Sequence, residues 1–237
     1  MPITNIAWRR QRRQVLEDRG DMKIAIIGAG NVGTALAGSF KRAGHDVIVA
    51  SRDPEDAGGV ATATGARVGA SNWAAADEAE VVVLAIPFSS VADVAQEIAT
   101  AVAGKPVVDA TNRMSFGAAG PEMDTSTSNA EELAGFLPRA HVIKAFNTLL
   151  ASRQVDPTSA GVQLDGFVAG DDAAAKATVL ELAGSIGLHP VDVGPLSRAR
   201  QLEGLAFLNI VLNVANGGKW QSGWKLVDAP EAAPLAA

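Results

Sequence analysis

Short apolar runs alternate along the chain with longer segments in which apolar residues recur every three or four positions. The runs are rich in Val, Ile and Ala, which is typical of strands buried on both faces of a parallel sheet. The longer segments, such as 32–40 and 91–102, have the spacing of helices with one buried face. This alternation predicts an α/β fold, a Rossmann-type doubly wound and mostly parallel sheet. The apolar runs are 23–27, 47–50, 81–86, 106–110 and 141–146.

The first predicted strand leads directly into a glycine-rich turn at the start of a helix. The turn has the form G-x-G-x-x-G, and a second strand follows the helix over residues 47–50. In such a unit the first glycine permits the tight turn, the second lets the backbone approach a diphosphate, and the third lets helix and strand pack closely. The motif therefore predicts a dinucleotide-binding site. Its residues are Gly28, Ala29, Gly30, Asn31, Val32 and Gly33.

The residues after the second strand distinguish between the two nicotinamide coenzymes. NAD-binding domains place an acidic residue there, which accepts hydrogen bonds from the ribose 2′-hydroxyl. This chain has Ser51 and Arg52 instead, and a hydroxyl beside a guanidinium favours a 2′-phosphate through charge-assisted hydrogen bonds. Asp53 is the competing candidate for a ribose-binding acid, but its place after the arginine favours an N-cap of the next helix. We therefore expect NADP(H) as the coenzyme.

The carboxyl ends of the predicted strands define the position of a ligand crevice, because ligands of doubly wound sheets bind beyond these ends. This rule places Ile86, Pro87 and Asn112 around one crevice with the glycine turn. Residues 113–127 follow directly and are rich in Gly, Ser and Thr. The segment is longer than a connection needs, so it is either a lid over the cofactor or a mobile loop.

The pattern changes after residue 150 and does not repeat the first half. Two further strands are predicted over 164–169 and 188–193, with a helix between them that Asp171 is expected to cap. A long helix over 196–216 follows, with leucines along one stripe. These elements predict a small C-terminal part that is α+β or helical.

The sequence divides into three parts on this interpretation. Residues 1–21, which contain five arginines, form a disordered basic extension, residues 22–150 form the NADP-binding Rossmann domain, and residues 151–237 form a small C-terminal region for substrate binding or dimerisation. Trp220 and Trp224 lie four positions apart in the last region. Large exposed aromatic side chains are typical of subunit interfaces, so we expect a homodimer.

The composition excludes several classes of chemistry. The 237 residues include no cysteine and no tyrosine, which excludes disulfides, thiolate chemistry, cysteine metal sites and a Tyr–Lys proton relay. Three histidines leave little for a metal site, so no metal is predicted. The net charge of −6 argues against nucleic acid, and no apolar run is long enough to cross a bilayer. We expect a cytoplasmic protein whose partner is a small redox molecule.

General acids are scarce near the expected position of the nicotinamide. His45 and His189 fall elsewhere on the predicted sheet, and Lys144 lies inside a strand, where a structural role is the better interpretation. Alcohol and keto-acid dehydrogenases need such an acid. Hydride transfer between a nicotinamide and a flavin-like ring needs mainly stacked rings and the exclusion of water. The sequence therefore predicts an NADPH-dependent oxidoreductase without a catalytic side chain.

The glycine turn, the Ser-Arg pair and several later segments resemble one family. This family is the NADPH-dependent deazaflavin reductases that use coenzyme F420, whose NADP-binding domain is of the pyrroline-5-carboxylate reductase type. The later segments read VVVLAIP, VVDATN, HVIKAFNT and VDVGPLSRARQLEGLAFL, and the resemblance runs from residue 22 to about residue 226. It implies hydride transfer between NADPH and coenzyme F420 or a flavin, with the acceptor entering between the sheet and the C-terminal helix.

The resemblance also implies roles for individual residues. Residues 29–32 would hold the diphosphate, while Ser51 and Arg52 would hold the 2′-phosphate. The chain departs from the family in the strand that ends at Phe146 and Asn147, so these two residues are candidate walls of the acceptor pocket. The residues bordering the nicotinamide would be Ile86, Pro87, Val91 and Ala145.

Two other functions remain open at this point. One is a small-molecule imine or keto reductase of the β-hydroxyacid dehydrogenase type, which resembles the N-terminal half but needs a larger helical domain than the residues after Asn147 provide. The other is a non-catalytic NADP(H)-binding regulator, which the scarcity of acid and base residues supports. Hydride transfer to a deazaflavin or flavin distinguishes an enzyme from the regulator.

Overall fold

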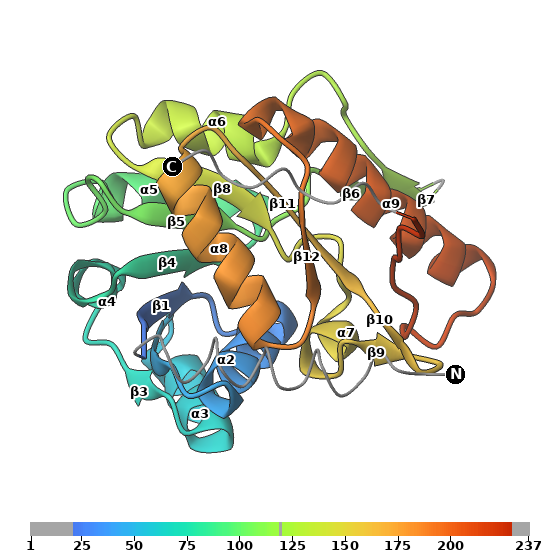
Figure 1. The fold of residues 1–237 in the computed structure, drawn as a ribbon. Helices are drawn as coiled ribbons and strands as arrows, with labels where there is room; N and C mark the ends of the chain where they lie inside the picture. The colour runs from blue at the N-terminus through green and yellow to red at the C-terminus, as the bar shows by residue number, and fades with distance from the viewer. Residues whose placement is uncertain (1–20, 119, 229–237) are drawn as a thin grey trace.

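The computed structural model describes residues 21–118 and 120–228 and contains an eight-stranded sheet of order β12-β11-β8-β5-β4-β1-β2-β3. Every pairing from β3 to β8 is parallel, whereas β11 is antiparallel to β8 and β12 is parallel to β11. The doubly wound, mostly parallel sheet is thus confirmed (Figure 1). The strands are β1 (Lys23–Ile27), β2 (Asp46–Ala50), β3 (Arg67–Val68), β4 (Val81–Leu84), β5 (Pro106–Asp109), β8 (His141–Ala145), β11 (Asp165–Gly170) and β12 (His189–Asp192).

Helices cover both faces of the sheet, and the strands send alternate side chains to each face (Figure 1). Ile24 and Ile26 pack on the side of α2, α3 and α8, while Ala25 and Ile27 pack on the side of α4, α5 and α6. Burial on both faces explains why the strands are apolar at nearly every position. The helices are α2 (Asn31–Arg42), α3 (Pro54–Thr64), α4 (Asn72–Glu78), α5 (Val91–Ile98), α6 (Asn129–Phe136), α7 (Ala151–Val155), α8 (Ala173–Ser185) and α9 (Ala199–Ala215). Shorter elements are η1 (Phe88–Ser90), η2 (Leu196–Arg198), the hairpin of β6 (Ser115–Gly117) with β7 (Gly120–Glu122), and the hairpin of β9 (Thr158–Ser159) with β10 (Val162–Gln163).

Two predicted helix caps have different outcomes. Asp53 caps α3, where its side chain accepts a hydrogen bond from the N–H of Glu55, as expected. The prediction for α8 is wrong by one residue, because Asp172 caps its first turn. Asp171 accepts the N–H of Leu196 instead and so joins the start of α8 to η2. The basic extension expected over residues 1–21 lies, up to residue 20, outside the described residues.

The segment over residues 113–127 contains the short β6–β7 hairpin, so it is not wholly irregular. Arg113 anchors its start. The guanidinium lies 5.3 Å from the centre of the Phe88 ring, and it pairs with Asp124 at 3.2 Å and with Glu132 of α6 at 2.5 Å. The hairpin is thereby attached to η1 and α6, and its role as a lid stays a prediction.

Helix α9 has its polar and apolar residues on unexpected sides. Asn209 and Asn213 are buried, whereas Leu208 and Leu212 are 47% and 49% exposed. The amide of Asn213 donates to the hydroxyl of Ser222 at 2.7 Å, and this hydroxyl donates to the amide oxygen of Asn209 at 2.5 Å. These bonds hold the segment after α9 against the inner side of the helix, which explains why the asparagines are buried.

The two tryptophans that follow α9 have different environments. Trp220 is 45% exposed and has a left-handed backbone conformation with φ of 55°. Trp224 is partly buried and packs against the apolar cluster that contains Phe167 and Leu202. Only Trp220 therefore belongs to the exposed surface near the end of α9.

His45 is buried after α2 and makes folding stability dependent on pH. Its Nδ1 accepts the N–H of Met22 at 3.4 Å, and its Nε2 lies 3.0 Å from the hydroxyl oxygen of Ser185. Burial lowers the pKa of His45 below its ordinary 6.5, and Asp21 opposes this effect. Because the pKa of His45 is lower in the folded state, its contribution to folding stability is fully present above pH 6.5 and is lost as the pH falls through the folded pKa.

The urea midpoint of unfolding should therefore change less between about pH 7.5 and 5 in His45→Gln than in the wild type. An equal change in both proteins would contradict this role of His45.

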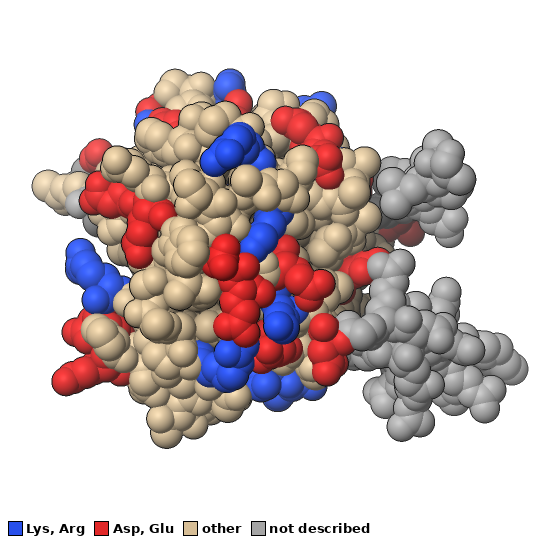
Figure 2. Space-filling view, turned by 90° about the vertical axis from the view of Figure 1, so that its left-hand side faces the viewer, with Lys and Arg blue, Asp and Glu red and all other residues tan. Residues whose placement is uncertain are grey.

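Charged side chains of both signs are interspersed on the face shown in Figure 2, and the described part of that face has no extended basic patch. Ion pairs on the surface place side chains of opposite charge next to each other. Arg67 lies 3.0 Å from Asp46 and 2.7 Å from Glu78, and its hydrogen bonds lower the pKa of both carboxyls. Within the ranges that the structure describes, no helix combines the length and the apolar character that spanning a membrane requires.

Candidate cofactor-binding site

The glycine turn connects β1 to α2, and two of its glycines are required by the fold itself. Gly28 has φ of +120° and its N–H donates to the carbonyl of Ala50 at 2.8 Å. A Cβ at Gly28 would overlap the carbonyl oxygen of Ala85, and a Cβ at Gly33 would overlap the carbonyl oxygen of Gly28. Close packing of strand, turn and helix therefore explains both residues.

Gly30 differs from these two, because nothing in the described fold requires a glycine there. Its φ is −79°, which any residue adopts, and beyond its chain neighbours no atom lies within 4 Å of a Cβ built on it. The open space lies at the N-terminus of α2, whose first turn has no acidic residue and no side-chain cap. Free N–H groups at a helix N-terminus bind anions. The diphosphate of a dinucleotide fits this place.

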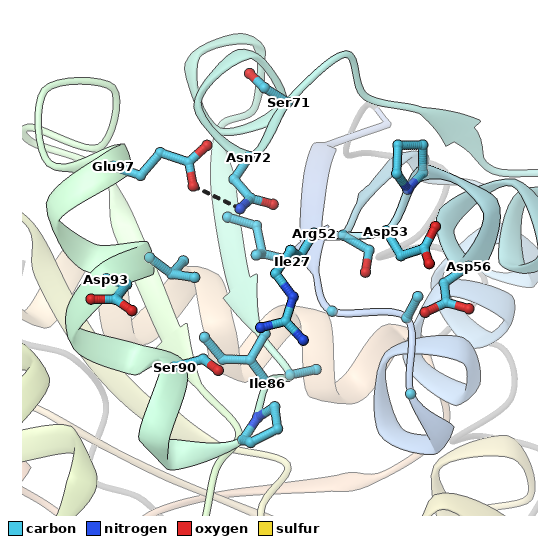
Figure 3. A pocket seen from close by; sticks show the side chains of 18 of the residues that line it. Ile27, Arg52, Asp53, Asp56, Ser71, Asn72, Ile86, Ser90, Asp93 and Glu97 are labelled. Carbon is cyan, nitrogen blue, oxygen red and sulfur yellow. Dashed lines mark hydrogen bonds between the residues drawn. The ribbon is translucent and has the colours of Figure 1, made fainter.

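A cavity of about 690 Å³ extends from the glycine turn across the carboxyl ends of β1, β2 and β4 to α4 and α5 (Figure 3). It brings together seven of the residues that the sequence predicted to bind the coenzyme. They are Gly28, Ala29, Gly30, Ser51, Arg52, Ile86 and Pro87. The site therefore combines the turn, the Ser-Arg pair and the end of β4 in one hollow.

Arg52 is the only cation among the described residues that line this cavity. Its side chain reaches from the end of β2 towards the middle of the cavity, near Ile86 (Figure 3). Within the described chain, its guanidinium has no hydrogen-bond or ion-pair partner. Asp53, the competing ribose-binding acid, is engaged with the N–H of Glu55 at 2.9 Å. An unpaired guanidinium in a cavity suits a phosphate.

Sequence reasoning missed the far wall of the cavity, which α4 and α5 form. There the amide of Asn72 donates to the carboxylate of Glu97 at 2.8 Å, with Asp93 on the same side of the cavity (Figure 3). Asp53 and Asp56 lie on the opposite side, so four carboxylates surround Arg52. The four-residue spacing of Asp93 and Glu97 places both on one face of α5, and that spacing was the available signal.

Several other predicted residues lie outside this cavity. Val91 and Ala145 are 1% and 0% exposed and belong to the core on the two sides of the sheet. Phe146 has φ of 64°, is 1% exposed, and packs its ring 5.8 Å from that of Phe40. The ring of Phe146 therefore fills the core and does not form a wall of an acceptor pocket. Asn31 and Val32 form the first turn of α2 beside the cavity.

Asn112 and Asn147 form a reciprocal pair at the carboxyl ends of β5 and β8. The amide of Asn147 donates to the side-chain oxygen of Asn112 at 2.9 Å, and the amide of Asn112 donates to the backbone carbonyl of Asn147 at 3.2 Å. In the strand order, β5 and β8 lie on the opposite side of β4 from β1 and β2. The pair therefore lies at the same edge of the sheet as Arg52 but several strands away.

The residues that could have acted as general acids have other partners. Lys144 is 0% exposed and lies 2.8 and 2.7 Å from two buried carboxylates. His189 lies 2.8 Å from the buried carboxylate of Asp165, and His45 is buried near α2. These three residues do not line the cavity. The contacts of Lys144 agree with the structural role expected for it, and the two histidines lie away from the cavity, as expected.

Comparisons with known proteins bear on the same segments. The family model for NADP oxidoreductase, coenzyme F420-dependent, matches residues 23–113. The F420-dependent NADP reductase of Methanothermobacter marburgensis is 34% identical over 226 residues, which cover 89% of this chain and 100% of that protein. Metalloreductase STEAP3 of Rattus norvegicus is 32% identical over 187 residues, which cover 77% of this chain and 36% of that protein.

A solved structure extends the similarity to three dimensions. A protein of Arthrobacter sp. FB24, with the provisional description F420-dependent NADP reductase, superposes with a TM-score of 0.76 at 34% identity, covering 83% of this chain and 96% of that chain. The fold and the glycine turn thus define a Rossmann-type reductase. More specifically, the chain belongs to the family of F420-dependent NADP reductases.

Proposed function

We propose that this protein transfers hydride between NADP(H) and coenzyme F420 or a flavin-type acceptor with a similar ring. The observation that carries the proposal is the guanidinium of Arg52, which is unpaired within the described chain and reaches into the cavity that begins at Gly30. A 2′-phosphate at Arg52 and a diphosphate at the open side of Gly30 fit one dinucleotide. The names of its relatives, F420-dependent NADP reductases, supply the class of acceptor.

In this proposal the chain binds and orients two redox cofactors. Bound NADPH supplies the hydride. The first turn of α2 holds the diphosphate, Ser51 and Arg52 hold the 2′-phosphate, and Ile86 and Pro87 border the nicotinamide. In this proposal the rate enhancement comes from the orientation of the two rings and the exclusion of water.

The acceptor side is assigned to a different part of the chain. Residues 22–150 bind NADP(H), and residues 151–237 complete the acceptor site, chiefly through α9. The pair of Asn112 and Asn147 supports this assignment, since it lies at the carboxyl ends of the strands nearest to the C-terminal part of the sheet. A cytoplasmic location belongs to the same hypothesis.

The proposed hydride transfer is tested by a screen in which the oxidation of NADPH is measured by absorbance. Coenzyme F420, FMN, FAD and several cyclic imines are offered as acceptors, each with NADPH and with NADH. We expect the fastest oxidation with coenzyme F420 and NADPH. Oxidation by imines alone would favour an imine reductase, and tight NADPH binding without oxidation by any acceptor would favour a non-catalytic NADP(H)-binding regulator.

We further propose that the outer face of α9 forms a homodimer interface. Large apolar side chains of a helix are normally buried against another element. In α9 the buried side includes Leu202, while Leu208 and Leu212 are 47% and 49% exposed, with Trp220 beyond the helix at 45%. A second copy of this chain would cover these side chains.

Leu208→Glu combined with Leu212→Glu is expected to reduce the particle mass to about half, because the interface would have to bury two unpaired charges from each copy. Light scattering measures the mass. Val162→Glu is the matched control, since Val162 is an apolar residue 46% exposed on the β9–β10 hairpin. A dimer that survives the double substitution would place the interface elsewhere.

A further inference from the structure

We propose that a buried ionic cluster of Lys144, Asp109 and Glu203 positions α9 against the carboxyl ends of β5 and β8, and so determines the geometry of the acceptor side. Lys144 and Glu203 act as positioning residues in this arrangement. The inference rests on the proposed function in one respect, because the cluster is expected to control the binding of the acceptor.

Lys144 is completely buried and uses all of its donors within the cluster. Its Nζ lies 2.8 Å from Oδ2 of Asp109, 2.7 Å from Oε1 of Glu203 and 2.5 Å from the carbonyl oxygen of Thr111. An ammonium group has three hydrogens, and three acceptors surround this one. Lys144 therefore has no donor left for a substrate, and its effect on the reaction must pass through its neighbours.

Glu203 connects α9 to three other parts of the chain. Its Oε1 accepts from Lys144 in β8 and from the N–H of Asn129 at the start of α6, at 2.9 Å. Its Oε2 accepts the N–H of Arg113, after β5, at 3.1 Å. A carboxylate at the N-terminus of α6 is favoured by the helix dipole. One side chain thus fixes α9 relative to α6, β8 and the segment after β5.

A second ionic contact joins the same two helices one turn away. Arg200 of α9 donates two hydrogen bonds to the carboxylate of Glu131 in the first turn of α6, both at 2.8 Å. Two directional contacts on neighbouring turns define the rotation of α9 about its axis and its position along that axis. Apolar contacts such as that of Leu202 leave more freedom, since apolar cores lose a unique arrangement before they lose stability.

Stability alone does not explain the cluster. Removing ions from water is costly, and apolar replacements of buried ionic groups are often neutral or stabilising. Here two buried carboxylates face one ammonium. Burial raises the pKa of Glu203, and the charge of Lys144 opposes that effect. The hydrogen bonds of the cluster have defined directions, and apolar contacts in the same place would not.

The cluster lies beside the Asn112–Asn147 pair and away from the coenzyme cavity. Thr111, whose carbonyl accepts from Lys144, directly precedes Asn112, and Lys144 lies three residues before Asn147. The members of the cluster do not line the cavity that contains Arg52. A displaced α9 would therefore change the acceptor side while the adenosine end of the coenzyme binds as before.

The test is a triple variant, Asp109→Asn with Lys144→Met and Glu203→Leu, which replaces the cluster with uncharged side chains of similar size. We expect it to fold, to keep the Kd for NADPH within about twofold, and to raise the KM for coenzyme F420 by about tenfold or more, which is the effect of losing about one hydrogen bond to the acceptor. Arg67→Met is the control, because it removes an ionic cluster at the edge strand β3, away from β5 and β8. It should change neither constant.

Amide hydrogen exchange supplies a readout that does not depend on activity. In the triple variant we expect faster exchange over α9 and at the amides of Arg113 and Asn129, with little change over α2. Wild-type exchange together with a wild-type KM would overturn the proposal. If the wild type does not reduce coenzyme F420, the proposed function fails, and the exchange data still decide whether the cluster positions α9. If the triple variant does not fold, the same measurements are made on Glu203→Gln.

Discussion

Arg52→Ala is expected to raise the KM for NADPH by roughly 10- to 150-fold, which corresponds to about 1.5–3 kcal/mol for hydrogen bonds to a charged group. The KM for NADH should change by less than about twofold, since NADH has no 2′-phosphate. The side chain lies in the cavity and has no partner within the described chain (Figure 3). Its removal should therefore leave the fold intact. Steady-state kinetics with both coenzymes at a saturating acceptor concentration measure the difference.

Two controls separate this effect from a general loss of charge. Arg67→Ala removes a surface arginine that is paired with Asp46 and Glu78 outside the cavity, and it should leave both KM values unchanged. Arg52→Lys keeps the charge but loses the planar, forked donors, so an intermediate KM for NADPH is expected. An increase of equal size for NADPH and NADH would reject the 2′-phosphate role of Arg52.

Gly30→Val is expected to weaken dinucleotide binding by about 100-fold or more, because the side chain would occupy the place of the diphosphate. The fold should tolerate the change. The φ of −79° suits valine, the space beside Gly30 is open, and an unfavourable residue at the N-cap of α2 costs about 1 kcal/mol. NADPH titration and thermal unfolding of the same variant measure the two effects.

Gly33→Val is the matched control for this loss of binding. A Cβ at Gly33 would overlap the carbonyl oxygen of Gly28, so this variant should lose stability as well as binding. The two glycines of one motif are thus expected to differ, one being required by the ligand and the other by the fold. Normal NADPH binding by the Gly30→Val variant would place the diphosphate elsewhere.

The N-terminal half was the part most open to prediction. Strand β1, the glycine turn and helix α2 depend on contacts within one short unit, whose apolar run and glycine spacing are visible in the sequence. The cap by Asp53 is equally local, since its partner Glu55 is two residues away. The roles of residues within one such unit can be predicted from their spacing, because the residues are close together along the chain.

The rest of the candidate site depended on contacts between distant segments. Asn72 of α4 and Glu97 of α5 meet on the far wall of the cavity, and the spacing within either helix does not reveal that they pair. Phe146 was predicted as the last residue of a strand, but β8 ends at Ala145, and the left-handed backbone of Phe146 directs its ring into the core against Phe40. The alternation of side chains between the two faces of a sheet holds only within a strand. It therefore could not predict whether the residue after the strand end lies in the core or in the wall of a pocket.

By itself, the sequence determined the main strands of the sheet, the glycine turn and the Ser-Arg pair, because each is encoded by residues close together in the chain. It did not predict α7 or the β6–β7 and β9–β10 hairpins. Only the tertiary structure decided which side of α9 is buried, and only it brought Asp109, Lys144 and Glu203 into contact. The physical reason is that α9 has apolar residues on both sides and polar residues on its buried side, so its periodicity does not select a face. Hydrogen bonds from distant segments to Glu203 make that selection, and the segment after α9 then pairs with Asn209 and Asn213.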